Sequence, residues 1–253
     1  MAHRLLQGIV PGRSHILDAR NCQDALSSIT FEINSKSYVV GVVADGCGGG
    51  KHSEVGAQLA VQFIPREIRR LVKNGLPLEH IPNLLFEHLI HLLKTIVAAY
   101  NFADLVELVH FVNHHLLFTV LGFIVGPEQT LVFAAGDGIV IINDDIHLRD
   151  QHNAPAYIGY HLVDRRYLGE DATPLAHAFD LYTIPTETLK RLAIGSDAWM
   201  EEQALLDQVW GLKPPADLQL QMNRWSDARR LKDDASMIVV ELENTTRGDD
   251  LWM

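Results

Sequence analysis

Short apolar runs rich in β-branched and aromatic residues occur in two groups along the chain, and this order restricts the possible folds more than any other feature. Turn residues such as NSKS, GPEQ and GD separate neighbouring runs, which predicts hairpins and an antiparallel meander. Between the groups, apolar residues recur at helical spacing in one stretch that Ser53 could cap, with Glu54 in its first turn, and in another from about Pro82. The expected strands are 27–33, 38–45, 116–125, 130–135, 138–144, 189–197 and 235–243. Because no linker or repeat is visible, we expect one α+β domain over residues 1–253, with an irregular segment at about 150–185.

The composition excludes several classes of protein. Hydrophobic residues make up 47% of the chain and charged residues 21%, the balance of a globular rather than a disordered protein. The formal net charge of -11 repels the phosphates of nucleic acid, which argues against such a partner. Two cysteines, Cys22 and Cys47, form no disulfide framework and suit a reducing compartment. No secretory signal is visible, and the apolar stretch 116–126 is shorter than the ~20 residues of a membrane span. We therefore expect a cytoplasmic protein that binds neither nucleic acid nor membrane.

Aspartates lie where the apolar runs begin or end. In a packed sheet such positions can gather along one edge, where carboxylates repel one another unless a cation neutralises them. Oxygen ligands select hard cations such as Mg²⁺ or Mn²⁺, and two such ions make a common hydrolytic site. Glycines at 46 and 48–50 would let the backbone approach a bound ion. A single strand-terminal Asp is ordinarily a turn residue, so the hypothesis depends on the whole set. The set is Asp24, Asp45, Asp137, Asp197, Asp233 and Asp234.

These aspartates belong to five short motifs that occur in a fixed order. The motifs are NCQD (21–24), VVADGCGGG with SEVGA (42–57), AAGDG (134–138), IGSDA (194–198) and KDDAS (232–236). In this order they resemble the motifs of the metal-dependent protein phosphatases of type 2C, over nearly the whole chain. NAPAYI at 153–158 is similar to a stretch of the bacterial branch of that family.

The resemblance implies a fold and a set of metal ligands. The fold is a central antiparallel β-sandwich flanked on both faces by pairs of antiparallel helices, with the metals in a cleft at one end. Asp45 would bridge two Mg²⁺ or Mn²⁺ ions, the carbonyl of Gly46 would bind one of them, and Asp137 would hold a third, weaker ion. Asp24 would bind directly or through water. The full ligand set implied is Asp24, Asp45, Gly46, Asp137, Asp197 and Asp233.

The activity that the resemblance implies is hydrolysis of phosphoserine or phosphothreonine in a phosphorylated protein substrate. A hydroxide shared by the two ions would attack phosphorus, so no protein nucleophile is needed. The catalytic residues implied are Asp45 and Asp24, with Arg20 as the nearest candidate for a phosphate-binding arginine and Arg13 as the alternative. The irregular segment at about 150–185 would correspond to the variable flap of the family.

The sequence departs from the family pattern in ways that keep other functions open. Ala198 follows Asp197 where Gly is usual, which matters only if the backbone needs a positive φ there. Cys47 stands where some members carry a His proposed as a general acid, and Asp234 is the runner-up to Asp233 as a ligand. The alternatives are a catalytically degenerate phosphatase fold that serves as a binding or regulatory module, and a hydrolase of small phosphoesters.

Two other candidate sites carry less weight. His110 and His114 could share a helix face, but no Glu lies between them as in a zinc protease, so we expect an exposed or hydrogen-bonded pair. Ser196 lies beside Asp197 but outside a G-x-S-x-G motif, so we do not expect a nucleophile there.

Overall fold

Two antiparallel sheets face each other in the computed structural model, which describes residues 3–152, 155–164, 175–212 and 217–242. The strands are β1 (His3–Val10), β2 (Asp24–Ile33), β3 (Lys36–Asp45), β4 (Val120–Val125), β5 (Gln129–Ala135), β6 (Gly138–Ile142), β7 (Asp145–Arg149), β8 (Asp180–Pro185), β9 (Arg191–Gly195) and β10 (Ala235–Leu242). The first sheet has the order β1-β10-β9-β6-β7 and the second β2-β3-β4-β5-β8.

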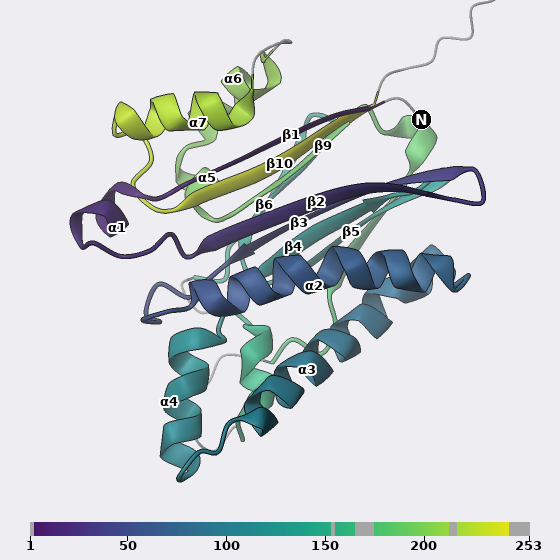
Figure 1. Cartoon of the computed structure of the whole chain (residues 1–253). Helices are drawn as coiled ribbons and strands as arrows, with labels where there is room; N and C mark the ends of the chain where they lie inside the picture. The colour runs from purple at the N-terminus through teal and green to yellow at the C-terminus, as the bar shows by residue number, and fades with distance from the viewer. Residues whose placement is uncertain (1–2, 153–154, 165–174, 213–216, 243–253) are drawn as a thin grey trace, which may run out of the picture.

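Helices cover the outer face of each sheet (Figure 1). The α-helices are α1 (Arg13–Leu17), α2 (Glu54–Lys73), α3 (Ile81–Ala99), α4 (Leu105–His115), α5 (Ala198–Glu201), α6 (Leu206–Trp210) and α7 (Leu218–Asp227). Short 3-10 helices are η1 (Leu78–His80), η2 (Ile158–Leu162), η4 (Thr186–Thr188) and η5 (Gln203–Leu205). The long helices α2 and α3 lie outside the second sheet, and α6 and α7 lie outside the first (Figure 1). The predicted antiparallel sandwich between helices is confirmed.

Apolar side chains fill three layers of core. Between the sheets, Val43, Phe123 and Ile238 are fully buried, because inward positions alternate along each strand. Outside the second sheet, α2 buries Ala57 and Ile64 at helical spacing, and it runs through Pro65 without a break. A separate cluster, which includes Trp199 and Trp225, lies between the first sheet and helices α5 to α7. Because the two sheets pack face to face, strand ends from both sheets lie near one another at the ends of the sandwich.

The chain crosses from the second sheet to the first between β5 and β6. The predicted meander through residues 116–144 is wrong at this point, since β4 pairs with β5 whereas β6 pairs with β7 and β9. The cause is a pair of glycines: Gly136 and Gly138 take φ values of +96° and +134°, which residues with a Cβ rarely adopt. Asp137 lies between them and is 6% exposed. The crossing thus places this aspartate at the end of both sheets.

Three strands were not predicted from the sequence. One of them, β8, falls in the segment expected to be irregular, so that expectation is wrong for Asp180–Pro185, which pairs with β5 at the sheet edge. Its residues alternate between exposed and half-buried, and the apolar run that marks a central strand is missing. The other two are β1 and β7. Residues 153–154 and 165–174 of the predicted flap lie outside the described residues.

Among the described residues, one helical segment, Leu78–Ala99, is long and apolar enough by length and composition alone to cross a membrane, which the stretch 116–126 is not. An 18-residue window of this segment has a mean hydropathy of 1.2, and 33% of that window is buried. Its buried residues include Leu85, Leu89 and Leu93, which belong to the core between the second sheet and its helices. The same test is passed by core helices, so the expectation of no membrane partner stays a prediction.

Candidate functional site

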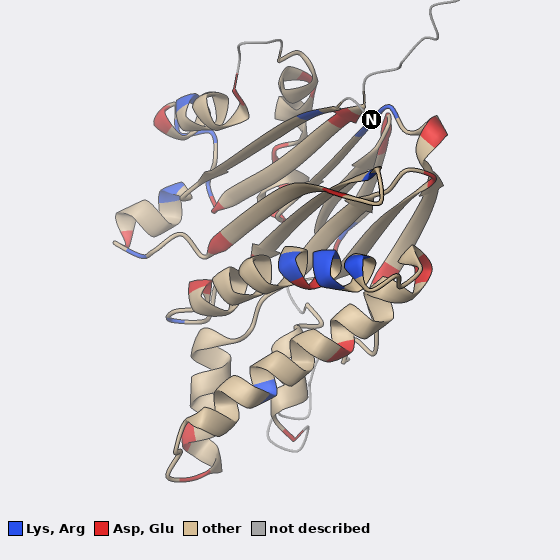
Figure 2. Cartoon of the chain, turned by 45° about the vertical axis from the view of Figure 1, so that its right-hand side comes forward, with Lys and Arg blue, Asp and Glu red and all other residues tan. Residues whose placement is uncertain are grey.

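Acidic residues lie at several strand ends, while the middles of the sheets carry few charges (Figure 2). The hairpin β2–β3 supplies the first pair. The two strands pair without interruption from the turn at Ile33 and Lys36 to their other end, where Asp24 lies directly opposite Asp45. The backbone oxygen of Asp45 accepts a hydrogen bond from Thr119 N at 2.8 Å, which fixes the strand end. The two carboxylates therefore come from neighbouring strands at one edge of the sheet.

The glycine turn after Asp45 folds back against the start of α2. A Cβ on Gly46 would lie 2.7 Å from Ser53 Oγ, so only glycine fits this close approach. Ser53 does not cap α2 as predicted, because its Oγ donates to the carbonyl of Cys47 at 2.9 Å instead. Arg20 donates from Nη2 to the carbonyls of Gly48 (2.8 Å) and Gly50 (2.9 Å). The guanidinium therefore holds the turn in place, and its predicted contact with phosphate stays a prediction.

A cleft of about 270 Å³ lies at this end of the sandwich. Its walls carry four of the predicted carboxylates, the predicted backbone ligand and residues from the glycine turn. The lining residues are His15, Gln23, Asp45, Gly46, Cys47, Gly48, Gly49, Asp137, Pro155, Tyr157, Asp197 and Asp233. An adjoining hollow of about 280 Å³ shares Asp197 and Asp233 with the cleft and adds Glu201 and Glu202, whereas hollows of about 380 and 420 Å³ farther away have fewer carboxylates among the described residues. The sequence-predicted ligand positions thus converge on a single cleft, with Asp24 buried behind Asp45.

Asp24 has the chemical environment expected of a group that binds a cation. It is 3% exposed, and neither carboxylate oxygen has a hydrogen-bond partner among the described residues. Burial raises its pKa to about 7; the side chains of Ser236, Ser196 and Asp45 lie near enough to oppose this rise, although none meets hydrogen-bond geometry. Burying an ionised carboxylate without a partner costs several kcal/mol of folding free energy, and a bound cation would offset this cost.

The other carboxylates repel one another across the cleft. Burial, followed by the charges of Asp24 and Asp197, raises the pKa of Asp45 well above its ordinary value. Burial and the charges of Asp137 and Asp233 raise the pKa of Asp197 to about 6. Burial also raises the pKa of Asp137. Oxygen ligands that are crowded, buried and mutually repulsive fit hard divalent cations, as the sequence predicts.

This repulsion predicts how the stability of the cation-free protein depends on pH. Asp24 and Asp197 have pKa values of about 7 and 6 in the folded state, above the ~3.9 of an exposed Asp. Between these limits the folded state binds more protons than the unfolded state, so stability falls as pH rises from about 4 to about 7. A bound cation removes this loss. Differential scanning fluorimetry should show that Mn²⁺ raises the melting temperature more at pH 7.5 than at pH 5, relative to EDTA. An equal rise in melting temperature at pH 5 and pH 7.5 would contradict the raised pKa values of the buried carboxylates.

Asp234 has a different role from its neighbour Asp233. Its oxygens accept hydrogen bonds from Gly12 N (2.6 Å), Gln23 N (2.5 Å) and the Nδ1 atom of His15 (2.6 Å). Asp233 is exposed and lines the cleft, and its Oδ1 accepts from Asp234 N at 2.8 Å. Asp234 is therefore occupied by the chain, which supports Asp233 as the ligand candidate.

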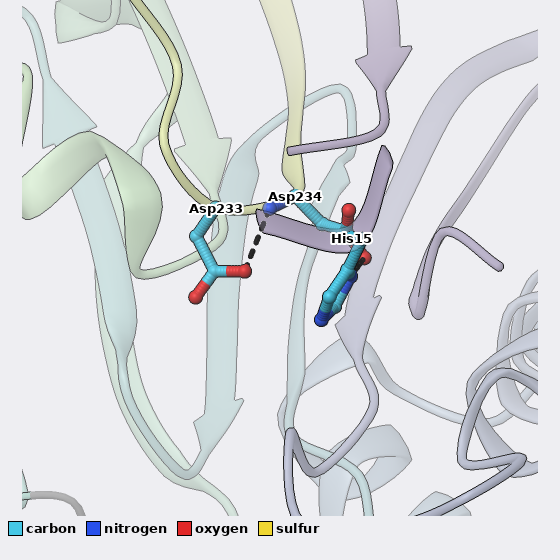
Figure 3. Close-up of side chains that lie close together, drawn as sticks. All are labelled: His15, Asp233 and Asp234. Carbon is cyan, nitrogen blue, oxygen red and sulfur yellow. Dashed lines mark hydrogen bonds and ion pairs between the residues drawn. The ribbon is translucent and has the colours of Figure 1, made fainter. Parts of the chain in front are cut away.

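Sequence reasoning missed His15. Its ligand-type atoms and those of Asp233 and Asp234 lie within 4.8 Å of one another (Figure 3), which makes this the one such group among the described residues. The close packing beside His15 depends on Gly12, where a Cβ would lie 2.2 Å from the carbonyl carbon of Asp233, and only the structure shows this approach. Tyr157 was also missed, although it lies in the NAPAYI stretch.

Ala198, the main departure from the family pattern, fits without strain. It begins α5 and is not among the described residues with positive φ, so a methyl group does not displace the backbone of Asp197. This removes the structural reason for expecting a degenerate site.

Both cysteines are free. Burial, together with the charges of Asp24 and Asp234, raises the pKa of the Cys22 thiol. Cys47 lines the cleft near Tyr157, and burial followed by the proximity of Cys47 raises the pKa of the Tyr157 hydroxyl. Neither observation indicates a reactive thiolate.

The remaining candidates lie apart from the cleft or in its supporting core. His110 and His114 are on α4 with ring centroids 4.2 Å apart, and His114 Nδ1 accepts from Lys51 N at 3.1 Å. Burial and the charge of His110 lower the pKa of His114. Ser196 is fully buried and its Oγ accepts from Ser236 N at 3.1 Å, so it is not placed as a nucleophile.

Several solved structures with the same fold are named as phosphatases. The serine/threonine phosphatase Stp1 from Staphylococcus aureus is 14% identical, with a TM-score of 0.61 and coverage of 96% of each chain. A bacterial serine phosphatase is 13% identical, with a TM-score of 0.62 over 96% of this chain and 98% of that one. The S. agalactiae serine/threonine phosphatase is 14% identical, with a TM-score of 0.54 over 96% and 100%. No curated protein matches the sequence. At these identities the likeness shows the fold.

The carboxylate-lined cleft lies at the strand ends of a sandwich of two antiparallel sheets between helices, the fold that these solved structures share. The model of the family described as Protein phosphatase 2C matches residues 11–155, more than half of the chain, and the chain belongs to this family. The resemblance stated from the five motifs is confirmed.

Proposed function

We propose that the chain is a Mg²⁺- or Mn²⁺-dependent phosphatase of phosphoserine and phosphothreonine in proteins. The observation that carries the proposal is the buried Asp24, which has no hydrogen-bond partner in the part of the chain that the structure describes and lies directly opposite Asp45, one of the repelling carboxylates of the cleft. A site of this kind is costly to fold unless cations bind there. The serine/threonine specificity is supported by the names of the fold relatives.

The residues of the cleft have separable tasks in this proposal. Two ions, with a third at Asp137, would be held by the carboxylates and by the carbonyl of Gly46. Bound divalent cations would supply an activated water and offset the charge of the phosphate. The full set of proposed ligands is Asp24, Asp45, Gly46, Asp137, Asp197 and Asp233.

Other residues hold this set in place. The close approach of Gly46 to Ser53 fixes the turn after Asp45, and Arg20 anchors the carbonyls of that turn. Asp234 ties the segment that carries Asp233 to the segment that leads into Asp24. Free cysteines support a cytoplasmic location.

The proposal is tested with a phosphothreonine peptide and the purified full chain. We expect turnover in Mn²⁺ and none in EDTA, with activity restored when Mn²⁺ is returned in excess. Isothermal titration calorimetry should detect Mn²⁺ binding in the same samples. Cation binding without turnover of any phosphoester would instead support a regulatory module, and turnover that EDTA leaves unchanged would contradict the metal site.

A further inference from the structure

His15 is held in one orientation inside the protein. The residue is 7% exposed, and its Nδ1 lies 2.6 Å from Asp234 Oδ2. Backbone donors from Gly12 and Gln23 also bind the Asp234 carboxylate, which therefore cannot rotate away. A histidine whose Nδ1 faces a fixed carboxylate presents its Nε2 in one direction, as in the dyads of acid–base catalysts.

The short helix that carries His15 is fastened to the segment before β10. The backbone nitrogens of Arg13 and Ser14 donate to the carbonyls of Leu231 (3.2 Å) and Lys232 (3.1 Å). Gly12 packs so tightly on Asp233 that no side chain fits. The ring of His15 is thus positioned relative to the cleft by backbone contacts on both sides.

The free end of the ring faces the cleft. His15 lines it together with Asp45, Asp137, Asp197 and Asp233. In Figure 3 one ring nitrogen lies against Asp234 and the other lies at the opposite end of the ring. No described residue forms a hydrogen bond with Nε2, in contrast to Nδ1. Ionised carboxylates accept protons but do not donate them, so His15 supplies an acid that the carboxylates of the wall lack.

We propose that His15 is a catalytic residue that protonates the leaving oxygen of the substrate from Nε2. This role rests on the proposed phosphatase function. As the bond between phosphorus and the serine or threonine oxygen breaks, its electron pair goes to that oxygen, which takes the Nε2 proton. The oxygen of the attacking water forms the new bond to phosphorus, and a proton released by that water restores His15. The Nδ1 atom of His15 keeps its proton throughout and donates it in a hydrogen bond to Asp234, whose carboxylate stabilises the charged ring. The products are the free alcohol and inorganic phosphate.

The test compares two substrates that differ in their need for an acid. A phosphothreonine peptide releases an alkoxide, which leaves poorly without a proton, whereas p-nitrophenyl phosphate releases a stable phenolate. The variant is His15→Asn, because the Asn amide can still donate to Asp234 while the ring end that faces the cleft is removed. His147→Asn, on β7 and beside Tyr182, is the matched control.

We expect His15→Asn to lower kcat for the peptide by about 100-fold and for p-nitrophenyl phosphate by less than ~5-fold, as for loss of a general acid. Mn²⁺ affinity measured by calorimetry should fall by much less than kcat for the peptide, because His15 is not one of the proposed ligands and the Asn amide keeps the hydrogen bond to Asp234. Equal losses on both substrates, or a large loss of Mn²⁺ affinity, would overturn the role of His15 and leave the phosphatase function standing. Failure of the wild-type protein to turn over either substrate would overturn both.

A second measurement needs no variant and so does not depend on the folding of His15→Asn. The wild-type protein is assayed with phenyl phosphates whose leaving groups become progressively more basic. Protonation by the enzyme predicts that kcat/KM changes little along the series, because the leaving oxygen never carries a full charge. A steep decline with increasing basicity would overturn the proposal.

Discussion

Asp45→Asn is expected to lower turnover of a phosphothreonine peptide by at least ~1000-fold, since cation catalysis contributes several kcal/mol and each 1.4 kcal/mol is about tenfold. Asp45 lies between the charges of Asp24, Asp197 and Asp137, so it is the group through which the whole cluster is coupled. Asparagine keeps the shape of the side chain but removes its charge and turns an amide donor towards the bound ions. Mn²⁺ affinity measured by calorimetry should fall together with activity.

This loss should not result from unfolding. Removing one charge relieves the repulsion in the cation-free cleft, so the melting temperature of Asp45→Asn in EDTA should equal or exceed that of the wild type. Asp145→Asn, at an exposed position on β7, is the control and should keep full activity. Full Mn²⁺-dependent turnover by Asp45→Asn would show that the catalytic cations bind elsewhere.

Asp234→Ala is expected to lower the free energy of unfolding by about 3 kcal/mol, because it leaves buried donors without their acceptor. The three groups affected are Gly12 N, Gln23 N and the ring of His15. For a chain of this size such a loss corresponds to a fall in melting temperature of roughly 6–12 °C. Urea denaturation followed by circular dichroism measures the change directly.

The neighbouring residue provides the comparison. Asp233 is exposed and accepts one hydrogen bond from the chain, so Asp233→Ala in EDTA should cost less than ~1 kcal/mol. For Mn²⁺ affinity we expect the opposite order, because Asp233→Ala removes a proposed ligand and should weaken binding more than Asp234→Ala does. If both variants lost the same stability in EDTA, the division between a structural and a ligand aspartate would be wrong.

The central strands and the aspartates at their ends were predictable because both depend on local sequence. Runs such as YVVGVVAD show their burial directly, and the turn residues beside them mark where each carboxylate is presented. The edge strand β8 and the strand β1 were missed because half-exposed strands carry no continuous apolar run. The position of β6 was missed because two glycine φ values, rather than any pattern of hydrophobicity, decide which sheet the chain enters.

The supporting residues of the site were less accessible to sequence reasoning. His15 and Asp234 are 219 positions apart, and neither shows in isolation that it would be buried against the other. Gly12 looks like an ordinary loop glycine until the approach of Asp233 is known. Residues that tertiary folding brings to a site, and that belong to no sequence motif, can be identified only from the structure.

The pairing of β10 between β1 and β9 also bears on how the protein is made. A ribosome releases His3–Val10 and His15 early, but their partners in β10 and in the segment before it emerge only after residue 230 or so, roughly 10–50 s later at ordinary elongation rates. Until then the first sheet lacks its second strand and the cleft lacks one wall. The cleft of a growing chain is therefore expected to stay incomplete until β10 has been synthesised and inserted.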